Sequence, residues 1–429
     1  MLDFTEEQKL AQSAVRGWCA LHLEPKVPAM EGGRESIYPT MRELAATFGI
    51  ADLARAAFAD GASAQSAARS TPDDGASAQS AARSTPEGPK TSDRAGRGSS
   101  QSALMAILMM ELSRCCPGFA LAFGASLGLF GGAVMARGTR EQRERWALPV
   151  LTLEKIGAWA LTEPGAGSDA FGSMATRARR TDGGWILKGS KTFITNAPFA
   201  DLFVVYARVD DGASAQSAAR STPDNVRAFV VERSARGVAA SPPFAKMGMH
   251  ASPTGELFLD EVFVPDAQLL GGETSKANAR SAAKASLSNE RFGMTPMCLG
   301  MIERCLEESI RYAKERQQWG RPIAEFQLVQ EKIAKMYTAR TIARALLFRQ
   351  LEAEREGVSL PPEEASAAKL YVARTCTDCA LDAVQLMGGA GYMSGSVVEM
   401  MARDAKLFQI GGGTDEIQIL RIAREVLAA

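Results

Sequence analysis

The chain has 429 residues, 46% of them hydrophobic, and its 49 basic residues balance 49 acidic ones. This length exceeds the usual size of a single core, so two or three domains are expected. The balanced charge argues against a nucleic-acid partner, whose phosphates require a basic surface. Because Asp3, Glu6 and Glu7 come early, in place of a basic-then-apolar leader, we expect a cytoplasmic protein.

The first part of the chain has the period of amphipathic helices, with Val15 and Trp18 on one apolar face. A second helix is expected from Pro39 to Phe48. No charged residue occurs from Cys115 to Ala136, a length that could cross a membrane. Five glycines and Pro117 make this run weakly hydrophobic, so we expect buried core helices there and no membrane span.

One sequence, DGASAQSAARSTP, occurs at residues 60–72, 74–86 and 211–223. It cannot be a solenoid unit, because solenoid repeats stack in series and carry apolar faces. The repeat has too few large apolar groups to offset the entropy of ordering it. Residues 60–100 and 211–223 are therefore expected to be surface insertions in loops that tolerate added length.

From Ile156 to Leu270 the pattern changes to short β-rich runs between Gly, Pro and Asp turns. The expected strands include Trp185–Leu187, Leu202–Ala207, Ala228–Val231 and Leu257–Val264. Long helices are expected again afterwards, packed antiparallel as a bundle. They would run over residues 287–318, 325–356, 362–388 and 396–427. A small β domain between two helical ones is the predicted organisation.

Seven cysteines without framework spacing suit a reducing compartment. Cys376 and Cys379 lie at helical spacing on an apolar stripe, so buried thiols are expected rather than a redox pair. With only His22 and His250, the chain has little material for a histidine-rich metal site or a histidine-based triad.

The stretch from Trp159 to Asp169, WALTEPGAGSD, has the pattern of a ligand-binding loop. Gly165 and Gly167 would let the backbone approach a flat or phosphorylated ligand, with Thr162 and Ser168 offering hydroxyls on either side. Short glycine motifs are common, and an ordinary turn ending in Ser-Asp is the alternative.

Together with five further blocks, this loop resembles the acyl-CoA dehydrogenase family. The blocks, in order, are TEPGAGSD (162–169), FITN (193–196), RQQWGRPIAEFQ (316–327), QLMGGAGY (385–392), RDAK (403–406) and GTDEIQ (413–418). The resemblance covers residues 1 to about 55 and 101–429. It implies a mostly α fold with an N-terminal helical domain (1–155), a small middle β-barrel domain (156–275) and a C-terminal four-helix bundle (276–429).

Dehydrogenation of an acyl thioester needs a base for the α-proton and an acceptor for the β-hydride, and no side chain accepts hydride. The resemblance implies FAD as the acceptor, with Thr195 close to flavin N5. The implied FAD site comprises Trp159, Leu161, Thr162, Gly167, Ser168, Phe193, Ile194, Thr195, Arg316, Trp319, Gln327, Gln385, Gly388, Gly389, Thr414 and Glu416. Ordinary alternatives exist: Gln327 could simply begin a helix, and Arg316 could be a basic helix end favoured by the helix dipole.

The substrate would contact Ser168 through its thioester and Arg291 through its CoA moiety, with Gly412 also in its site. Many family members carry a glutamate where this chain has Gly412. Isovaleryl and long-chain members instead supply one from a Glu-Arg pair on another helix, which Glu290 and Arg291 match. Glu290 is thus the expected catalytic base, on the helix stripe formed by Met294, Met297, Met301 and Cys305.

Burial against methionines would raise the pKa of the Glu290 carboxyl, which suits a base facing a weak carbon acid. The alternative places Glu290 in a first helical turn, where the helix dipole favours acidic residues by about 0.3–1 kcal/mol.

The resemblance also implies an electron-transfer flavoprotein as electron acceptor. It implies a homotetramer or dimer in which QLMGGAGY reaches the flavin of a neighbouring subunit. Two other functions stay open: a same-fold oxidase or acyl-carrier-protein dehydrogenase, and a non-catalytic flavin-binding homologue.

Overall fold

The structure is a computed structural model that describes residues 3–56, 58, 91–210, 225–272, 279–358 and 360–428, without the side chains of 91–100, 210 and 279–290. All three copies of the repeat lie outside these residues. Residues 91–100, however, belong to helix α5 (Thr91–Cys115). The prediction of an insertion over 60–100 is therefore wrong in its last part. The polar TSDRAGRGSS start extends a helix whose later turns are apolar, and adding turns to an existing helix costs far less than nucleating one.

The N-terminal helices form as the sequence pattern predicts. Helix α1 (Glu6–Trp18) begins with a capping box in which Thr5 and Gln8 satisfy each other's backbone N–H groups. It is followed by α2 (Val27–Glu31) and α3 (Ile37–Thr47), and after α5 by α6 (Pro117–Gly124), α7 (Gly132–Arg137), α8 (Arg140–Gln142) and α9 (Leu148–Leu151).

The uncharged run packs inside the protein. Among the described residues, Pro117–Arg137 is the one helical stretch long and apolar enough to cross a membrane, and 61% of its apolar window is buried. The rings of Phe119, Phe123 and Phe130 are fully buried in the core. These contacts confirm the prediction of core helices.

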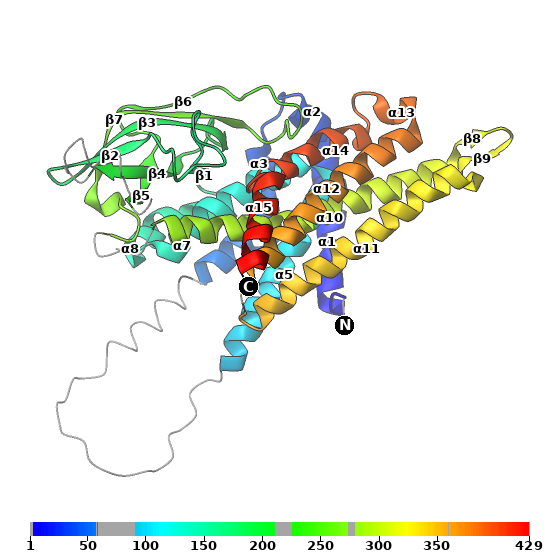
Figure 1. Cartoon of the computed structure of the whole chain (residues 1–429), viewed down its shortest axis with the longest axis horizontal. Helices are drawn as coiled ribbons and strands as arrows, with labels where there is room; N and C mark the ends of the chain where they lie inside the picture. The colour runs from blue at the N-terminus through cyan, green and yellow to red at the C-terminus, as the bar shows by residue number, and fades with distance from the viewer. Residues whose placement is uncertain are drawn as a thin grey trace, which may run out of the picture.

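A strand-rich middle domain follows, on one side of the helices (Figure 1). Its strands are β1 (Gly157–Ala160), β2 (Arg177–Thr181), β3 (Gly184–Thr195), β4 (Leu202–Asp210), β5 (Val226–Glu232), β6 (Val238–Ala240) and β7 (Thr254–Pro265). They pair in the order β1-β4-β2-β3-β7-β6, with β5 beside β4. Each expected β-rich run lies within one of these strands. The long antiparallel ladder of β3 and β7 ends at the pair Thr195–Thr254, which becomes part of the site.

The C-terminal part consists of long helices. These are α10 (Ala279–Glu315), α11 (Gln327–Arg355) and α12 (Pro362–Met387), followed by α13 (Gly389–Tyr392), α14 (Val397–Ala405) and α15 (Asp415–Ala428). A hairpin of β8 (Gln317–Gln318) and β9 (Arg321–Pro322) joins α10 to α11. The single helix expected over 396–427 is wrong, because a glycine turn separates α14 from α15. Gly412 and Gly413 have φ of 62° and 92°, which a right-handed helix cannot include.

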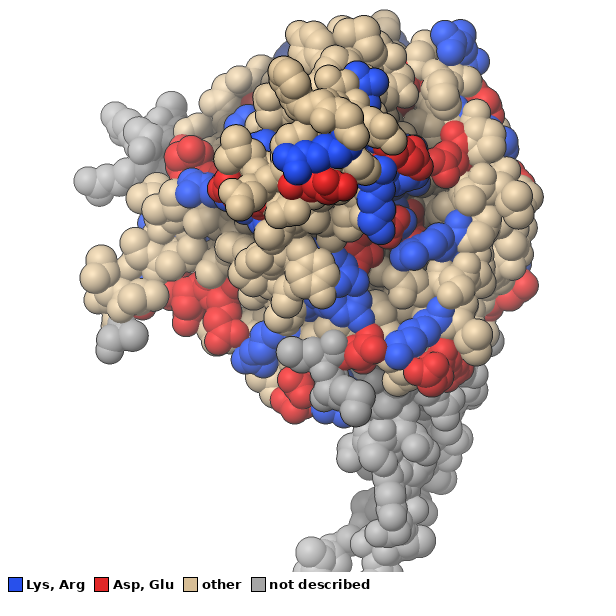
Figure 2. All heavy atoms as spheres, turned by 90° about the vertical axis from the view of Figure 1, so that its right-hand side faces the viewer, with Lys and Arg blue, Asp and Glu red and all other residues tan. Residues whose placement is uncertain are grey.

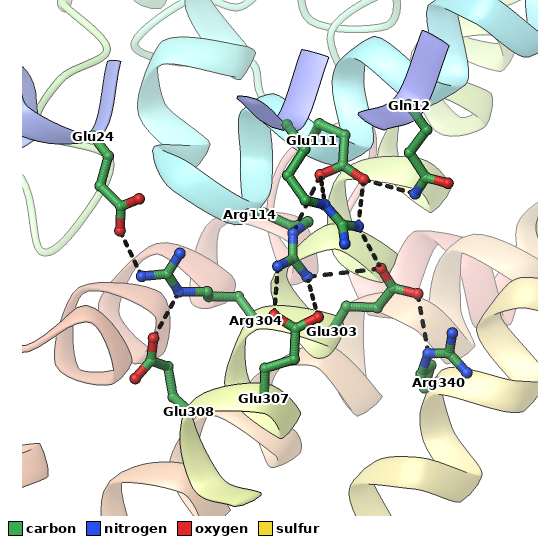
Figure 3. Close-up of polar contacts among 10 residues, drawn as sticks. Gln12, Glu24, Glu111, Arg114, Glu303, Arg304, Glu307, Glu308 and Arg340 are labelled. Atoms are coloured by element: carbon green, nitrogen blue, oxygen red, sulfur yellow. Dashed lines mark hydrogen bonds and ion pairs between the residues drawn. The ribbon is translucent and has the colours of Figure 1, made fainter. Parts of the chain in front are cut away.

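A partly buried ionic network connects the N-terminal helices to the bundle (Figure 3). Glu111 on α5, only 1% exposed, accepts from Gln12 at 2.7 Å and from Arg16 at 2.8 Å. Arg114 bonds Glu307 on α10 at 2.5 and 2.9 Å. On the molecular face in Figure 2, acidic and basic side chains lie side by side rather than in a single basic patch.

Candidate active site

Two neighbouring backbone segments bring the first two motifs together. The Thr192 amide, near the end of β3, donates to the Thr162 carbonyl at 2.9 Å. A Cβ atom added at Gly165 or Gly167 would meet no heavy atom within 4 Å. The glycine loop therefore borders open space beside the strand end that carries the FITN motif.

A buried ion pair clamps this loop at both ends. The Glu163 and Lys191 side chains are 3% and 0% exposed, with Nζ 2.8 Å from Oε1. Lys191 also donates to the Leu161 carbonyl at 3.1 Å, and Glu163 accepts the amides of Ala175 and Thr176 at 2.5 and 3.0 Å. These contacts fix where the chain enters and leaves the loop. The sequence interpretation missed this role of the pair, because β3 also carries the exposed Lys188 and no local pattern distinguishes the two lysines.

The charges of the pair depend on each other. Burial lowers the pKa of Lys191 to about 8, against the attraction of Glu163. Burial also opposes ionisation of Glu163, but Lys191 and the two amides outweigh it and hold the pKa of this carboxyl below its usual range. Glu163 is thus a structural carboxylate with filled hydrogen bonds, so it is a poor alternative base.

Backbone strain occurs at the end of β3. Phe193 and Asn196 have φ of 58° and 68°, and Phe193 is 69% exposed. Asn196 is buried, donates to the Ala122 carbonyl at 2.9 Å and accepts from the Tyr38 hydroxyl at 3.1 Å. Left-handed conformations at non-glycine residues persist only where surrounding contacts enforce them. Asn196 therefore anchors the strained strand end to the N-terminal helices.

The predicted cofactor residues of this region differ in what they offer. Leu161 and Ile194 are 4% and 3% exposed, so their side chains are buried in the protein. The Trp159 indole donates to the Tyr206 hydroxyl at 3.2 Å and packs edge-on against that ring. Ser168 is exposed and Thr195 half-buried, so both hydroxyl groups remain available to a ligand.

The predicted base, Glu290, lies in a segment that adjoins Gly412, the position where many family members carry their catalytic glutamate. Arg291 is 5% exposed, and its Nε donates to the Gly412 carbonyl at 3.1 Å. A Cβ at Gly411 would lie 3.7 Å from the Met294 side chain. Lys369 and Gln418 donate to the Gly413 carbonyl at 2.9 and 2.8 Å and hold the same turn. The Glu290–Arg291 segment of α10 thus packs against the Gly412 turn.

Helix α10 begins at Ala279, so Glu290 lies well inside the helix and not in its first turn. The helix-dipole explanation for Glu290 is therefore wrong. Its side chain is outside the described part of the structure, but the stripe on which it was placed is buried. The exposures of Met294, Met297, Met301 and Cys305 are 5%, 3%, 0% and 1%.

A second carboxylate near the turn is already occupied. Asp415 is 6% exposed and accepts from Arg374 Nε at 2.9 Å. Lys369 Nζ is a further 3.6 Å neighbour. A base must be free to accept a proton, so Asp415 does not compete with Glu290 for this role. The half-buried Thr414 precedes Asp415, and the exposed Glu416 follows it in the first turn of α15.

Several predicted cofactor residues lie far from the glycine loop within one chain. Arg316, Trp319 and Gln327 lie in or beside the β8–β9 hairpin that follows α10, at the opposite side of the molecule from the sheet (Figure 1). Arg316 directly follows α10 and Gln327 begins α11, as the ordinary alternatives supposed. The Trp319 side chain is 90% exposed. The exposed residues Gln385, Gly388 and Gly389 lie at the end of α12 and the start of α13, also away from the sheet (Figure 1).

The cysteines are buried thiols, as expected. All seven cysteines are free and buried, and burial raises the pKa of Cys379, which excludes a ready thiolate there. Among the described residues, no group of three or more His, Cys, Asp or Glu side chains could hold a metal ion.

The chain combines a helical domain, a strand-rich domain and a helical bundle, with a glycine loop open to a ligand. The chain belongs to the acyl-CoA dehydrogenase family: sequence models of the family's N-terminal, middle and C-terminal domains match residues 89–154, 158–262 and 280–427. The chain is an acyl-CoA dehydrogenase family oxidoreductase.

Three relatives show the range of the family. The chain is 34% identical to the mitochondrial isovaleryl-CoA dehydrogenase of Arabidopsis thaliana, over 75% of each chain. It is 36% identical to the 3-(aryl)acrylate reductase of Clostridium sporogenes, over 77% of this chain and 84% of that one. A caffeyl-CoA reductase-Etf complex subunit of Acetobacterium woodii is 35% identical over 75% and 81%.

Solved structures agree with the fold. The butyryl-CoA dehydrogenase of Megasphaera elsdenii has a TM-score of 0.80 and 27% identity, covering 99% of each chain. An acyl-CoA dehydrogenase complexed with FAD from Bacillus anthracis has a TM-score of 0.79 and 27% identity, covering 99% of this chain and 68% of that one. The prolyl acyl carrier protein oxidase AnaB has a TM-score of 0.79 and 25% identity, covering 99% and 100%.

Members of this family bind FAD, and the residues present fit that cofactor. The open space at Gly165 and Gly167 accepts a flat ring against the backbone. The exposed Phe193 and the half-buried Thr195 border the same strand end.

Proposed function

We propose that the protein oxidises an acyl-CoA thioester at its α and β carbons to the trans-2-enoyl-CoA, with FAD as cofactor and Glu290 as the base. The observation that carries this proposal is the 3.1 Å bond from Arg291 to the Gly412 carbonyl. It brings the Glu-Arg pair of α10 to the turn where many family members carry their glutamate. A carboxylate from either segment serves the same substrate carbon.

Each residue has a defined task in this reaction. Glu290 removes the α-proton, while Arg291, Lys369 and Gln418 hold the Gly412 turn that borders the acyl group. FAD, when bound, supplies the acceptor for the β-hydride at N5. The buried methionines of α10 exclude water around the base, which strengthens its tendency to accept a proton from the substrate. Ser168 orients the thioester through its exposed hydroxyl.

A homo-oligomer, a dimer or tetramer, completes the cofactor site in this proposal. One chain holds Arg316, Trp319 and Gln327 at the end opposite to its own sheet (Figure 1). Exposed Trp319, Tyr392 and Leu328 add apolar surface at 90%, 73% and 77% exposure. Residues from this end, together with Gln385, Gly388 and Gly389, would contact FAD held by a second copy. Such a contact would also cover the apolar surface.

The electron acceptor in this proposal is an electron-transfer flavoprotein, and the protein acts in the cytoplasm on fatty or branched acyl groups. The relative named as part of an Etf complex supports the acceptor. A second candidate is an oxidase or an enzyme of carrier-protein thioesters, because the structure of a carrier protein oxidase matches across the whole chain.

Anaerobic mixing of the holoprotein with a series of acyl-CoAs tests the proposal. Bleaching of the visible flavin band by one chain length identifies a dehydrogenase and its substrate. Rapid return of the band on admitting air, without added flavoprotein, would favour the oxidase. Bound FAD that no acyl thioester reduces, on CoA or on a carrier protein, would identify a non-catalytic homologue and contradict both candidates.

A further inference from the structure

The turn at residues 246–252, between β6 and β7, is held by groups from three parts of the chain; we name it the junction turn. Inside it, the Ser252 amide donates to the Met249 carbonyl at 2.9 Å. Lys246 Nζ donates to the Ser252 carbonyl and to Thr254 Oγ1, the latter at 3.1 Å. Met249 has a φ of 53°, a strained value that external contacts must maintain.

Two carboxylates from other helices accept amides of this turn. Asp404, the penultimate residue of α14, is fully buried and accepts the Met249 amide at 2.5 Å. Glu31, the last residue of α2, accepts the Ala251 amide at 2.9 Å. A Cβ at Gly248 would lie 2.5 Å from the Arg403 carbonyl carbon, so the turn packs directly on the backbone of α14. The junction turn is thus held by both helical domains.

The same segment continues into the strand end of the cofactor site. The Asn196 amide donates to the Pro253 carbonyl at 2.7 Å, and Thr195 pairs with Thr254 across the β3–β7 ladder. The rings of Phe193 and Phe244 lie 6.0 Å apart, edge to face. A displaced junction turn would therefore move the strained Phe193–Asn196 segment.

We propose that Asp404 is a positioning residue for the cofactor site: it holds the junction turn against α14 and thereby fixes Phe193–Asn196. This rests on the proposed role of Thr195 beside the flavin, but not on which acyl group is oxidised. Asp404 is assigned no contact with cofactor or substrate. Its side chain acts through the Met249 amide and the adjoining strand.

Two substitutions separate hydrogen bonding from charge. Asp404→Asn keeps an oxygen that can accept the Met249 amide and removes the negative charge. Asp404→Ala removes the acceptor and leaves a buried amide unpaired. Loss of a hydrogen bond to a charged group changes an opening equilibrium about tenfold or more.

Hydrogen–deuterium exchange of the full-length FAD-bound protein tests the inference, with the FAD dissociation constant measured alongside. In Asp404→Ala we expect exchange to rise about tenfold or more in peptides covering 249–254 and also in those covering 192–197, with weaker FAD binding. Asp404→Asn should restore both peptides and the FAD affinity. Glu111→Ala is the matched control, because it removes a buried carboxylate from the helices far along the chain from the turn. It should change neither peptide.

Three results would overturn the inference. Faster exchange confined to residues 249–254 would show that a displaced junction turn does not alter the end of β3. If Glu111→Ala raised exchange in these peptides and weakened FAD binding equally, Asp404 would contribute only to global stability. Failure of Asp404→Asn to restore FAD affinity would show that hydrogen bonding is not the cause. If Asp404→Ala does not fold, Glu31→Ala removes the other acceptor, and unchanged 192–197 exchange in that variant would equally contradict the proposal.

Discussion

Lys191 is the residue on which the geometry of the glycine loop depends most directly. Its ammonium group is fully buried between Glu163 and the Leu161 carbonyl. Replacing it with Met keeps the volume but leaves Glu163 as an uncompensated buried charge, so we expect a loss of about 3–5 kcal/mol in unfolding free energy and weaker FAD binding. Urea unfolding and FAD titration measure the two effects.

The double variant Lys191→Met with Glu163→Gln provides the control for this prediction, because it removes both charges. It should regain part of the lost stability. A Lys191→Met protein with unchanged FAD affinity would show that the loop keeps its geometry without the ion pair.

Glu290 and Gly412 carry the second prediction at this scale. Glu290→Gln should retain FAD and bind acyl-CoA, yet reduce flavin slower by more than the roughly 10²–10⁴-fold usual for a lost general base, because Glu163 and Asp415 are already paired. Adding Gly412→Glu should restore part of the rate. Recovery stays partial because Gly412 has a φ of 62°, which a glutamate adopts only with strain. Anaerobic stopped-flow measures both rates, and an undiminished rate in Glu290→Gln would remove Glu290 from the mechanism.

Asp404 makes the stability depend on pH. Burial raises its pKa from 3.8 to about 7, so the folded protein binds this proton more tightly than the unfolded chain. Proton binding by Asp404 stabilises the folded protein fully at pH values below the pKa of this carboxyl in the unfolded chain. This stabilisation is lost as the pH rises through its pKa in the folded protein. The charged and titratable groups that face it are Glu31, Lys246, Arg403, Cys116 and Cys376. Lys246 titrates above this window, because burial lowers its pKa only to about 8.

Urea unfolding from about pH 5 to about pH 7 therefore tests this titration. Wild type should lose stability relative to Asp404→Asn as the pH rises through that range. A constant difference between the two proteins would show that Asp404 keeps one charge state throughout.

At the scale of elements, the strands and most helices were predictable because their period and turn residues are local properties. The expected Leu257–Val264 run lies inside β7, and the 362–388 helix matches α12 within one residue at its end. The break between α14 and α15, which the sequence interpretation did not predict, comes from Gly412 and Gly413. Their positive φ depends on Arg291 and Lys369 from distant helices. A local pattern cannot contain such contacts.

In the candidate site, too, local features were predictable from the sequence and contacts between distant segments were not. The sequence predicted the open backbone at Gly165 and Gly167 and the buried stripe from Met294 to Cys305, while the roles of the site residues remain predictions. The Glu163–Lys191 clamp and the junction turn were not, because they join residues whose partners lie on other strands or helices. The domain boundaries at 155 and 275 remain predictions.

The repeats carry a prediction at this scale. Deleting 60–86, or 211–223, should leave FAD content and activity largely intact, because neither segment has enough apolar surface to contribute to a core. The first deletion ends before α5 starts at Thr91, so it spares the helix that the sequence interpretation had assigned to the insertion. Flavin absorbance per protein after purification measures the outcome. Loss of FAD in either deletion would make the repeat a structural part of the fold.

At the scale of the whole molecule, a shared cofactor site predicts complementation between two inactive variants. Arg316→Ala should impair FAD held by the neighbouring subunit, and Glu290→Gln should disable the subunit's own chemistry. A mixed oligomer of the two contains one site with a wild-type Glu290 and a wild-type Arg316, so co-expression should restore part of the activity. Each variant expressed alone is the control. Mixed oligomers that form but stay inactive would contradict a site built from two subunits.

The ionic network of Figure 3 also affects the order in which the chain can fold during synthesis. Arg16 lies 4.0 Å from Glu303, and Arg114 bonds Glu307, so the partners of the first helices are among the later residues to leave the ribosome. A Cβ at Gly300 would lie 2.1 Å from the Met110 carbonyl oxygen, which shows how closely α10 must pack on α5. Until that segment emerges, the nascent chain exposes the apolar faces of α1 and α5. We expect chaperones to bind the unfinished polypeptide during this interval, and we expect the yield to depend on the translation rate.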